Sequence, residues 1–143
     1  MSPNILLVED NPADARLVQE ALVERALDAA LFWMPSGEQA LAFLRHDAAQ
    51  SAALMPDLVL LDLNLPGLSG HEVLAAIKQD PSLLHIPVVV LTSSSAPADV
   101  RAAYRAHANA YLVKPDDFDD FLALVADLHH HWLQAVLLPS RVA

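Results

Sequence analysis

The chain has 143 residues, a hydrophobic content of 55%, no cysteine and a formal net charge of −10 at pH 7. These values fit one folded domain and exclude a disordered chain, a disulfide framework and a thiolate metal site. The negative charge argues against nucleic acid and anionic membranes as partners, and without a visible secretory or membrane-spanning segment we expect a cytoplasmic protein.

Short apolar runs bounded by turn residues alternate with amphipathic stretches along the chain, as is typical of buried strands and the helices that cover them. Predicted strands cover residues 4–8, 28–34, 58–62, 87–91 and 110–113. Predicted helices cover residues 12–25, a segment that begins at Ser36, and residues 70–79, 97–107 and 116–138.

Two helix starts carry capping signals. Ser69, with Glu72 three residues later, predicts a capping box at the start of the third helix. Ser95 or a neighbour is expected to cap the fourth helix. That helix is rich in alanine, so its packing face is thin, which suits an element that can shift.

The alternation of strands and helices indicates βαβ crossovers and therefore a parallel sheet. Five such units, with polar residues after the first and third strands, fit the flavodoxin-like α/β fold, a doubly wound five-stranded sheet in the order 2-1-3-4-5. We expect the whole chain, residues 1–143, to form this one domain, with residues 129–143 extending the last helix.

Polar side chains follow four of the predicted strands: Glu9 and Asp10, then Asp62, Thr92 and Lys114. Because the carboxyl ends of parallel strands meet at one edge of a sheet, we expect these side chains to converge. The three carboxylates total −3, which the ammonium and one divalent cation would balance. The sequence therefore predicts a charged site at this edge.

The order and spacing of these residues resemble the receiver domain of two-component response regulators. The resemblance covers residues 4 to about 128 and includes Pro66 and Gly70, four and eight residues after Asp62, and Pro115 after the fifth strand. It implies a signalling protein rather than an enzyme. Such a protein takes a phosphoryl group from a sensor histidine kinase and responds by changing its conformation and its protein contacts.

The resemblance also implies roles around the phosphoryl group. Asp62 would be the phosphoacceptor, whose carboxylate attacks phosphorus to form an acyl phosphate. Lys114 would pair with the phosphoryl oxygens, directed into the site by a cis bond to Pro115. The backbone N–H of Ser93, together with Asn64, would complete the phosphate-binding group.

A metal ion and a switch follow from the same resemblance. Mg²⁺ would be held by Glu9, Asp10, Asp62 and the backbone carbonyl of Asn64. The Thr92 hydroxyl would swing to a phosphoryl oxygen and the ring of Tyr111 would follow it inward. With Pro115, these two residues would form the switch.

The C-terminal segment, residues 132–139, looks like that of the small single-domain regulators that partner cyanobacterial and bacterial phytochromes. A helix continued to Leu138 would overhang the sheet and leave an apolar patch, made of Trp132, Leu133, Val136, Leu137 and Leu138. Because such patches mark interfaces, we expect a homodimer through the last helix and the fourth and fifth strand–helix units. A tail folded back onto its own domain is the competing arrangement.

Three other functions fit less well. A Mg²⁺-dependent phosphohydrolase with the haloacid-dehalogenase-like pattern needs a second acid two residues past the nucleophile, where this chain has Asn64. A flavodoxin-type cofactor binder needs an anion cradle after the first strand, where Glu9 and Asp10 would repel phosphate. A pseudo-receiver module that ignores phosphate would not need the complete set of acids.

Overall fold

The computed structural model describes residues 2–50 and 55–139, with the backbone alone over residues 47–50. Within these residues the strands are β1 (Asn4–Val8), β2 (Ala30–Met34), β3 (Leu58–Leu61), β4 (Val88–Thr92) and β5 (Ala110–Val113). The helices are α1 (Pro12–Glu24), α2 (Gly37–Gln50), α3 (Gly70–Gln79), α4 (Pro97–Arg105), α5 (Phe118–His129) and the π-helix η2 (His130–Ala135). None of the helices in this part of the chain combines the length and the apolar character needed to cross a membrane.

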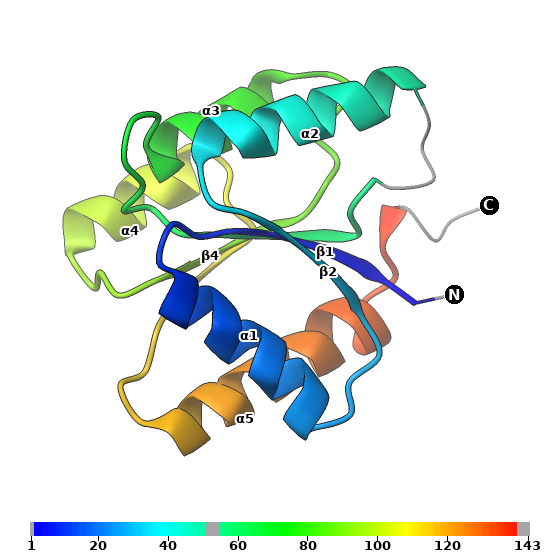
Figure 1. Cartoon of the computed structure of the whole chain (residues 1–143). Coiled ribbons are helices and arrows are strands. Elements are labelled where there is room, and N and C mark those ends of the chain that lie inside the picture. The colour runs from blue at the N-terminus through cyan, green and yellow to red at the C-terminus, as the bar shows by residue number, and fades with distance from the viewer. Residues whose placement is uncertain (1, 51–54, 140–143) are drawn as a thin grey trace.

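The strands form one parallel sheet in the order β2-β1-β3-β4-β5, which confirms the predicted flavodoxin-like α/β fold. Leu60 of β3 lies opposite Leu7 of β1 and Val89 of β4. Helices α1 and α5 cover one face of the sheet, and α2, α3 and α4 cover the other (Figure 1). All strands run the same way, so the loops that follow them meet at one edge.

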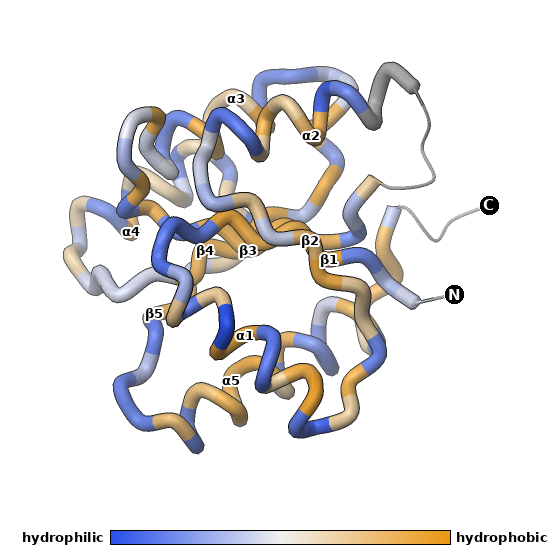
Figure 2. Tube along the Cα trace, in the orientation of Figure 1, coloured by the Kyte–Doolittle hydropathy of each residue, from blue (hydrophilic) through white to orange (hydrophobic). Residues whose placement is uncertain are grey.

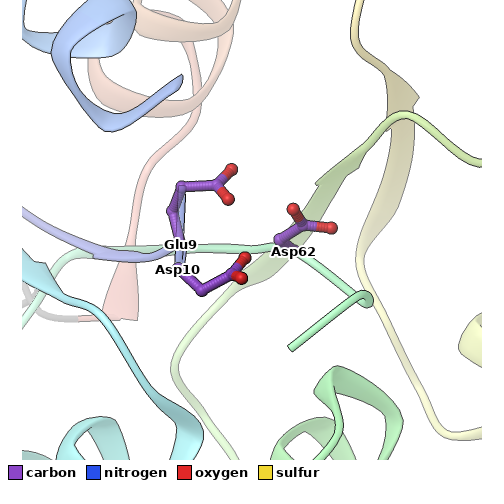
Figure 3. Close-up of side chains that lie close together, drawn as sticks. All are labelled: Glu9, Asp10 and Asp62. Atoms are coloured by element: carbon purple, nitrogen blue, oxygen red, sulfur yellow. The ribbon is translucent and has the colours of Figure 1, made fainter. Parts of the chain in front are cut away.

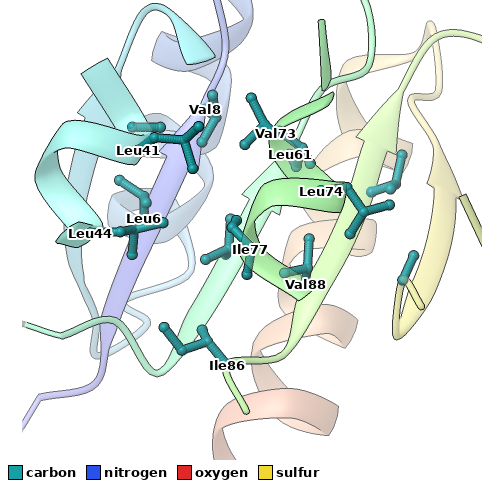
Figure 4. Packing of buried hydrophobic residues seen from close by; sticks show 14 of the residues in the cluster. Leu6, Val8, Leu41, Leu44, Leu61, Val73, Leu74, Ile77, Ile86 and Val88 are labelled. Atoms are coloured by element: carbon teal, nitrogen blue, oxygen red, sulfur yellow. The ribbon is translucent and has the colours of Figure 1, made fainter. Parts of the chain in front are cut away.

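The central strands are apolar on both sides because helices cover both faces. Figure 2 shows hydrophobic residues concentrated in these strands. Leu6 and Val8 pack toward α2 and α3, whereas Ile5 and Leu7 pack toward α1 and α5. Figure 4 shows the first of these layers. Each fully buried side chain of this kind contributes about 1.5–3 kcal/mol to the free energy of folding. A shift of one residue between strands would move these side chains out of their layers, so burial fixes the register of the strands and the place of the polar residues at their ends.

The capping box predicted for α3 is present: Ser69 Oγ accepts from Glu72 N at 3.2 Å, and Glu72 Oε1 accepts from Ser69 N at 3.3 Å. The Ser95 cap expected for α4 is wrong, because Ala96 occupies the N-cap and no side chain caps the helix. Instead Ser94, before the cap, accepts a hydrogen bond from Ala96 N at 3.3 Å. The turn before α4 is therefore held by a side chain that lies outside the helix.

The prediction of an α-helix that runs to Leu138 is wrong. Helix α5 ends at His129, η2 continues its path for one wider turn, and the chain becomes extended at Val136, where ψ is 137°. The buried His129 side chain helps to hold this end, with Nε2 2.9 Å from the Asp28 carbonyl oxygen. The remainder of the predicted extension, residues 140–143, lies outside the described residues.

The expected overhanging patch does not form as predicted. Trp132 and Leu133 are partly buried against the layer between the sheet, α1 and α5, and Leu138 is only 3% exposed. Leu137 is 76% exposed. The tail thus folds back onto its own domain, because burying these side chains there removes apolar area from water that a free helix would leave exposed.

Candidate functional site

Three carboxylates meet at the carboxyl edge of the sheet. Glu9 and Asp10 follow β1, Asp62 follows β3, and one oxygen from each lies within 4.8 Å of the other two (Figure 3). Glu9 and Asp62 are buried, whereas Asp10 is exposed. Because carboxylate oxygens are the ligands that hard divalent cations such as Mg²⁺ prefer, this set fits such a cation.

Backbone contacts hold Asp62 in position. Asp62 N donates to the Val8 carbonyl at 3.0 Å, and Asp62 Oδ1 accepts from Asn64 N at 3.1 Å. Gly70, at the start of α3, packs directly behind this residue: a Cβ at position 70 would lie 2.2 Å from the Asp62 carbonyl oxygen. Glycine is therefore required for α3 to approach the site this closely.

Lys114, after β5, reaches across to these carboxylates. Its Nζ lies 2.5 Å from Glu9 Oε1, 3.0 Å from Asp62 Oδ2 and 2.8 Å from Asp14 Oδ2. The expected cis bond to Pro115 is wrong, because residues 2–50 and 55–139 contain no cis peptide bond. The long lysine side chain spans the distance to the acids without that bend.

Asp14 is a site residue that the sequence reasoning missed. It lies in the first turn of α1, four residues after Asp10, and its side chain is part-exposed beside the ammonium. A helix predicted to begin at residue 12 has its first turn at the same edge of the sheet as Asp10. That position could have indicated from the sequence that Asp14 lies near the site. With Asp14, three carboxylates contact one ammonium group, and Asp10 lies in the same cluster as Glu9 and Asp62.

The pKa values of the buried groups move in different directions. Burial raises the pKa of Glu9 to about 7, with a contribution from the charge of Asp62 and against the opposing effect of Lys114. Burial also acts to raise the pKa of Asp62, but the Asn64 N–H, the nearby ammonium and the Thr92 hydroxyl outweigh it, so that pKa is lowered. Burial acts to lower the pKa of Lys114, yet its carboxylate partners raise it. At neutral pH Asp62 is therefore ionised and Lys114 is charged, whereas Glu9 takes up a proton more readily than an exposed glutamate does.

Thr92 and Tyr111, the predicted switch pair, both contact the loop between β4 and α4. Thr92 is fully buried at the end of β4, and its Oγ1 accepts from Ser94 N at 3.5 Å. The half-buried Tyr111 donates its hydroxyl to the Ser94 carbonyl at 2.8 Å. Ser93 is exposed in the same loop, and Pro115 directly follows the site lysine. The switch pair is thus connected through Ser94.

Trp33 is a second residue to which the sequence reasoning gave no role. Its Nε1 donates to the Glu9 carbonyl at 2.6 Å, and Glu9 N donates to the Met34 carbonyl at 3.2 Å. These two bonds tie the loop after β1 to the edge strand β2. They position the backbone from which two of the three carboxylates project.

Comparisons with known proteins agree with this geometry. The family model described as the response regulator receiver domain matches residues 5–126. Response regulator Rcp1 of Synechocystis sp. is 47% identical over 136 residues, which cover 95% of this chain and 92% of that protein. The crystal structure of the phosphorylated cyanobacterial phytochrome response regulator RcpA has a TM-score of 0.89 and 42% identity, and the match covers 97% of this chain and 99% of that one. The Mn²⁺-bound form of Rcp1 has a TM-score of 0.84 and 46% identity, covering 96% of this chain and 99% of that one.

Proposed function

The chain belongs to the response regulator receiver domain family, and we propose that it accepts a phosphoryl group from a sensor histidine kinase onto Asp62 in a Mg²⁺-dependent reaction. One observation carries the proposal: the Lys114 ammonium lies 3.0 Å from Asp62 Oδ2, beside two further acids that can hold a cation. The output is a changed conformation and changed protein contacts rather than turnover of a substrate.

In the proposed reaction a carboxylate oxygen of Asp62 attacks phosphorus, and the new O–P bond forms as the N–P bond of the kinase phosphohistidine breaks. The histidine leaves as neutral imidazole after taking a proton from solvent. Lys114 stabilises the phosphoryl oxygens as a point charge, and the Ser93 N–H and Asn64 contribute hydrogen bonds. A phosphohydrolase would need an acid at position 64 to activate water, and asparagine cannot supply it.

Mg²⁺ is the proposed cation, held by Glu9, Asp10, Asp62 and the backbone carbonyl of Asn64. The charges support this assignment: with Asp14, the four acids carry up to −4 and Lys114 carries +1. A divalent cation lowers the excess from −3 to −1, so that a phosphoryl group with roughly two negative charges can enter. The Mn²⁺ bound to Rcp1 supports a cation of this class.

Cation binding is expected to release a proton from Glu9. Its pKa is about 7 when no cation is present, whereas a metal ligand must be deprotonated. Mg²⁺ should therefore displace more protons at pH 6 than at pH 8, and its affinity should rise with pH until it levels off above the pKa of Glu9. Titration calorimetry at pH 6 in two buffers of different ionisation enthalpy measures the proton. Glu9→Gln is the control, and equal heats in both buffers for the parent chain would rule out this role of Glu9.

The switch belongs to the same proposal. Thr92 Oγ1 now accepts a weak bond from Ser94 N at 3.5 Å. A phosphoryl oxygen on Asp62 would accept a charge-assisted hydrogen bond from the same hydroxyl and draw the Thr92 side chain toward the site. Moving Thr92 changes the backbone of the loop that also binds the Tyr111 hydroxyl. The two residues and Pro115 thereby convert phosphorylation into a change on the surface formed by α4 and β5.

The partner we propose is a histidine kinase linked to a phytochrome, since RcpA is described as a phytochrome response regulator. Phosphorylation by such an ATP-dependent kinase would take place in the cytoplasm. The net charge of −10 supports protein partners and opposes nucleic acid. A phosphotransfer assay tests this partner. We expect rapid transfer of the phosphoryl group from an autophosphorylated phytochrome kinase and slow transfer from unrelated histidine kinases.

Acetyl phosphate with Mg²⁺ tests the chemistry without a kinase. Intact-mass measurement should show a gain of about 80 Da, the mass of an HPO₃ unit, and EDTA should abolish it. A chain that gains no mass at any Mg²⁺ concentration would contradict the proposed function.

We also propose a homodimer formed through the fourth and fifth strand–helix units, with α4, β5 and the last helix α5 together with the C-terminal segment that follows it. β5 is a sheet edge, and exposed apolar side chains lie on these elements, including Tyr104 at 49%, Val113 at 44% and Leu137 at 76% exposure. Size exclusion with light scattering should give about twice 15.5 kDa for the parent. Tyr104→Glu and Leu137→Glu should each shift the chain toward monomer, whereas Val23→Glu, on exposed α1, should not. A parent that is monomeric at all concentrations would refute the dimer.

A further inference from the structure

The carboxylate of Asp99 joins three elements around the loop between β4 and α4. Its Oδ2 accepts from Ser94 Oγ at 2.6 Å, and its Oδ1 lies 3.2 Å from Nε2 of His71 on α3. The hydroxyl of Ser94 and the His71 ring hold the pKa of Asp99 below its usual value, so the carboxylate is ionised and the ring nitrogen donates to it. We refer to His71, Ser94 and Asp99 as the Asp99 clasp.

The clasp lies between the two halves of the proposed switch. Ser94 contributes its N–H to Thr92 Oγ1 and its carbonyl to the Tyr111 hydroxyl. Its side chain is fixed at the same time, because Ser94 Oγ donates to Asp99 and accepts from Ala96 N. The place of the Tyr111 acceptor therefore depends on the bond between Ser94 and Asp99.

The other arm of the clasp leads back toward the phosphoacceptor. His71 follows Gly70, the residue that packs against the Asp62 carbonyl with no room for a side chain. Helices α3 and α4 lie side by side on one face of the sheet (Figure 1). A carboxylate shared between the α3 residue His71 and the loop residue Ser94 thus couples the position of the loop to the helix that backs Asp62.

We propose that Asp99 is a positioning residue for Tyr111: it fixes the Ser94 carbonyl that receives the tyrosine hydroxyl. It thereby favours the partly buried position of the ring against the core, which we call the inward position. The proposed function couples Thr92 and Tyr111 to phosphorylation, so the consequence for phosphoryl binding rests on that function. The effect of Asp99 on Tyr111 in the free protein does not. The competing explanation is that Asp99 only complements the N-terminal dipole of α4, where it is the acid of the first turn.

A fluorine label on Tyr111 separates these explanations. The chain has two tyrosines, so Tyr104→Phe leaves Tyr111 as the only site for 3-fluorotyrosine. In ¹⁹F NMR of the free protein, Asp99→Ala and Ser94→Ala should move the Tyr111 resonance toward its solvent-exposed value, and His71→Ala should move it less. Asp119→Ala, which removes a first-turn acid from α5 instead, is the matched control and should leave the resonance unchanged.

The double variant Asp99→Ala with Ala98→Asp restores an acid to the first turn of α4 from an exposed position beside the clasp. The resonance should stay displaced in it. Return of the resonance to the parent position, or an unchanged resonance in Asp99→Ala, would overturn the proposal. Because the clasp side chains are partly exposed, the Tm of the Asp99→Ala chain should differ little from that of the parent.

Titration of the same labelled proteins with beryllofluoride and Mg²⁺, a mimic of the phosphoryl group, tests the consequence. The Asp99→Ala chain should need about five-fold more beryllofluoride, because fewer molecules already hold the inward ring. If the parent binds no beryllofluoride, the proposed function is contradicted. The ¹⁹F spectra of the free proteins still test whether Asp99 positions Tyr111. Equal affinity of parent and variant, with the resonance displaced, would refute the link between Asp99 and the phosphoryl site.

Discussion

Asp62→Asn is expected to abolish phosphoryl uptake, with no gain of about 80 Da after incubation with acetyl phosphate and Mg²⁺ under conditions that convert the parent chain. The amide is not nucleophilic, so no acyl phosphate can form. Asparagine can still accept the hydrogen bond from Asn64 N, which now ends on Asp62 Oδ1 at 3.1 Å, so the β3–α3 loop should keep its shape.

The matched control is Asp127→Asn, which removes the same charge from an exposed position on α5. This variant should gain mass like the parent. Far-UV circular dichroism should show the same fold for all three chains. A full mass gain in Asp62→Asn would mean that another group receives the phosphoryl unit.

Asp10→Asn is expected to remove the stabilisation that Mg²⁺ gives to the folded chain. At a Mg²⁺ concentration of 100 times its Kd, a ligand that binds the folded state alone stabilises it by about 2.7 kcal/mol, or a Tm rise of roughly 5–10 °C for a chain of this size. The variant should show almost none of this rise, because it lacks one of three carboxylates that converge within 4.8 Å.

The same variant should be no less stable than the parent when Mg²⁺ is absent, since the charge of one of the three clustered carboxylates has been removed. Thermal unfolding with and without 10-fold excess EDTA over metal measures both effects. Asp127→Asn should retain the full response to Mg²⁺. An Asp10→Asn chain whose Tm rises with Mg²⁺ as much as that of the parent would show that the cation binds elsewhere.

The sheet could be predicted because its central strands are buried on both faces. The runs at Ile5, Val59 and Val89 are apolar at consecutive positions, and in a parallel sheet their polar neighbours must fall at one edge. Glu9 and Asp62 were therefore expected to meet from strand order alone. No side-chain geometry was needed for that expectation.

Asp14 and Trp33 could not be assigned in the same way. Neither follows a strand, and both reach the site through side-chain directions: Asp14 from the first turn of α1 and Trp33 from an edge strand that is only partly buried. Strand order brings elements together, but it does not state which of several nearby polar groups a long Lys114 side chain will contact.

The C-terminal segment was mispredicted because helical periodicity says which residues are apolar, not what they cover. Trp132, Leu133 and Leu138 fit one long amphipathic helix, yet the wider turn of η2 brings them back to the domain itself. The predicted cap of α4 was wrong for a related reason. Ser95 has a hydroxyl suited to capping, but the conformation of the turn places the Ser94 hydroxyl against Asp99 instead.

The central claim is that the phosphoryl group resides on one carboxylate beside the ammonium of Lys114. Borohydride reduction of the phosphorylated chain, followed by proteolysis and tandem mass spectrometry, locates that carboxylate, because the acyl phosphate is reduced while free acids are not. We expect homoserine at position 62, in an amount equal to the phosphorylated fraction. Homoserine at position 10 or 14, or no reduced aspartate in a chain that has gained about 80 Da, would contradict it.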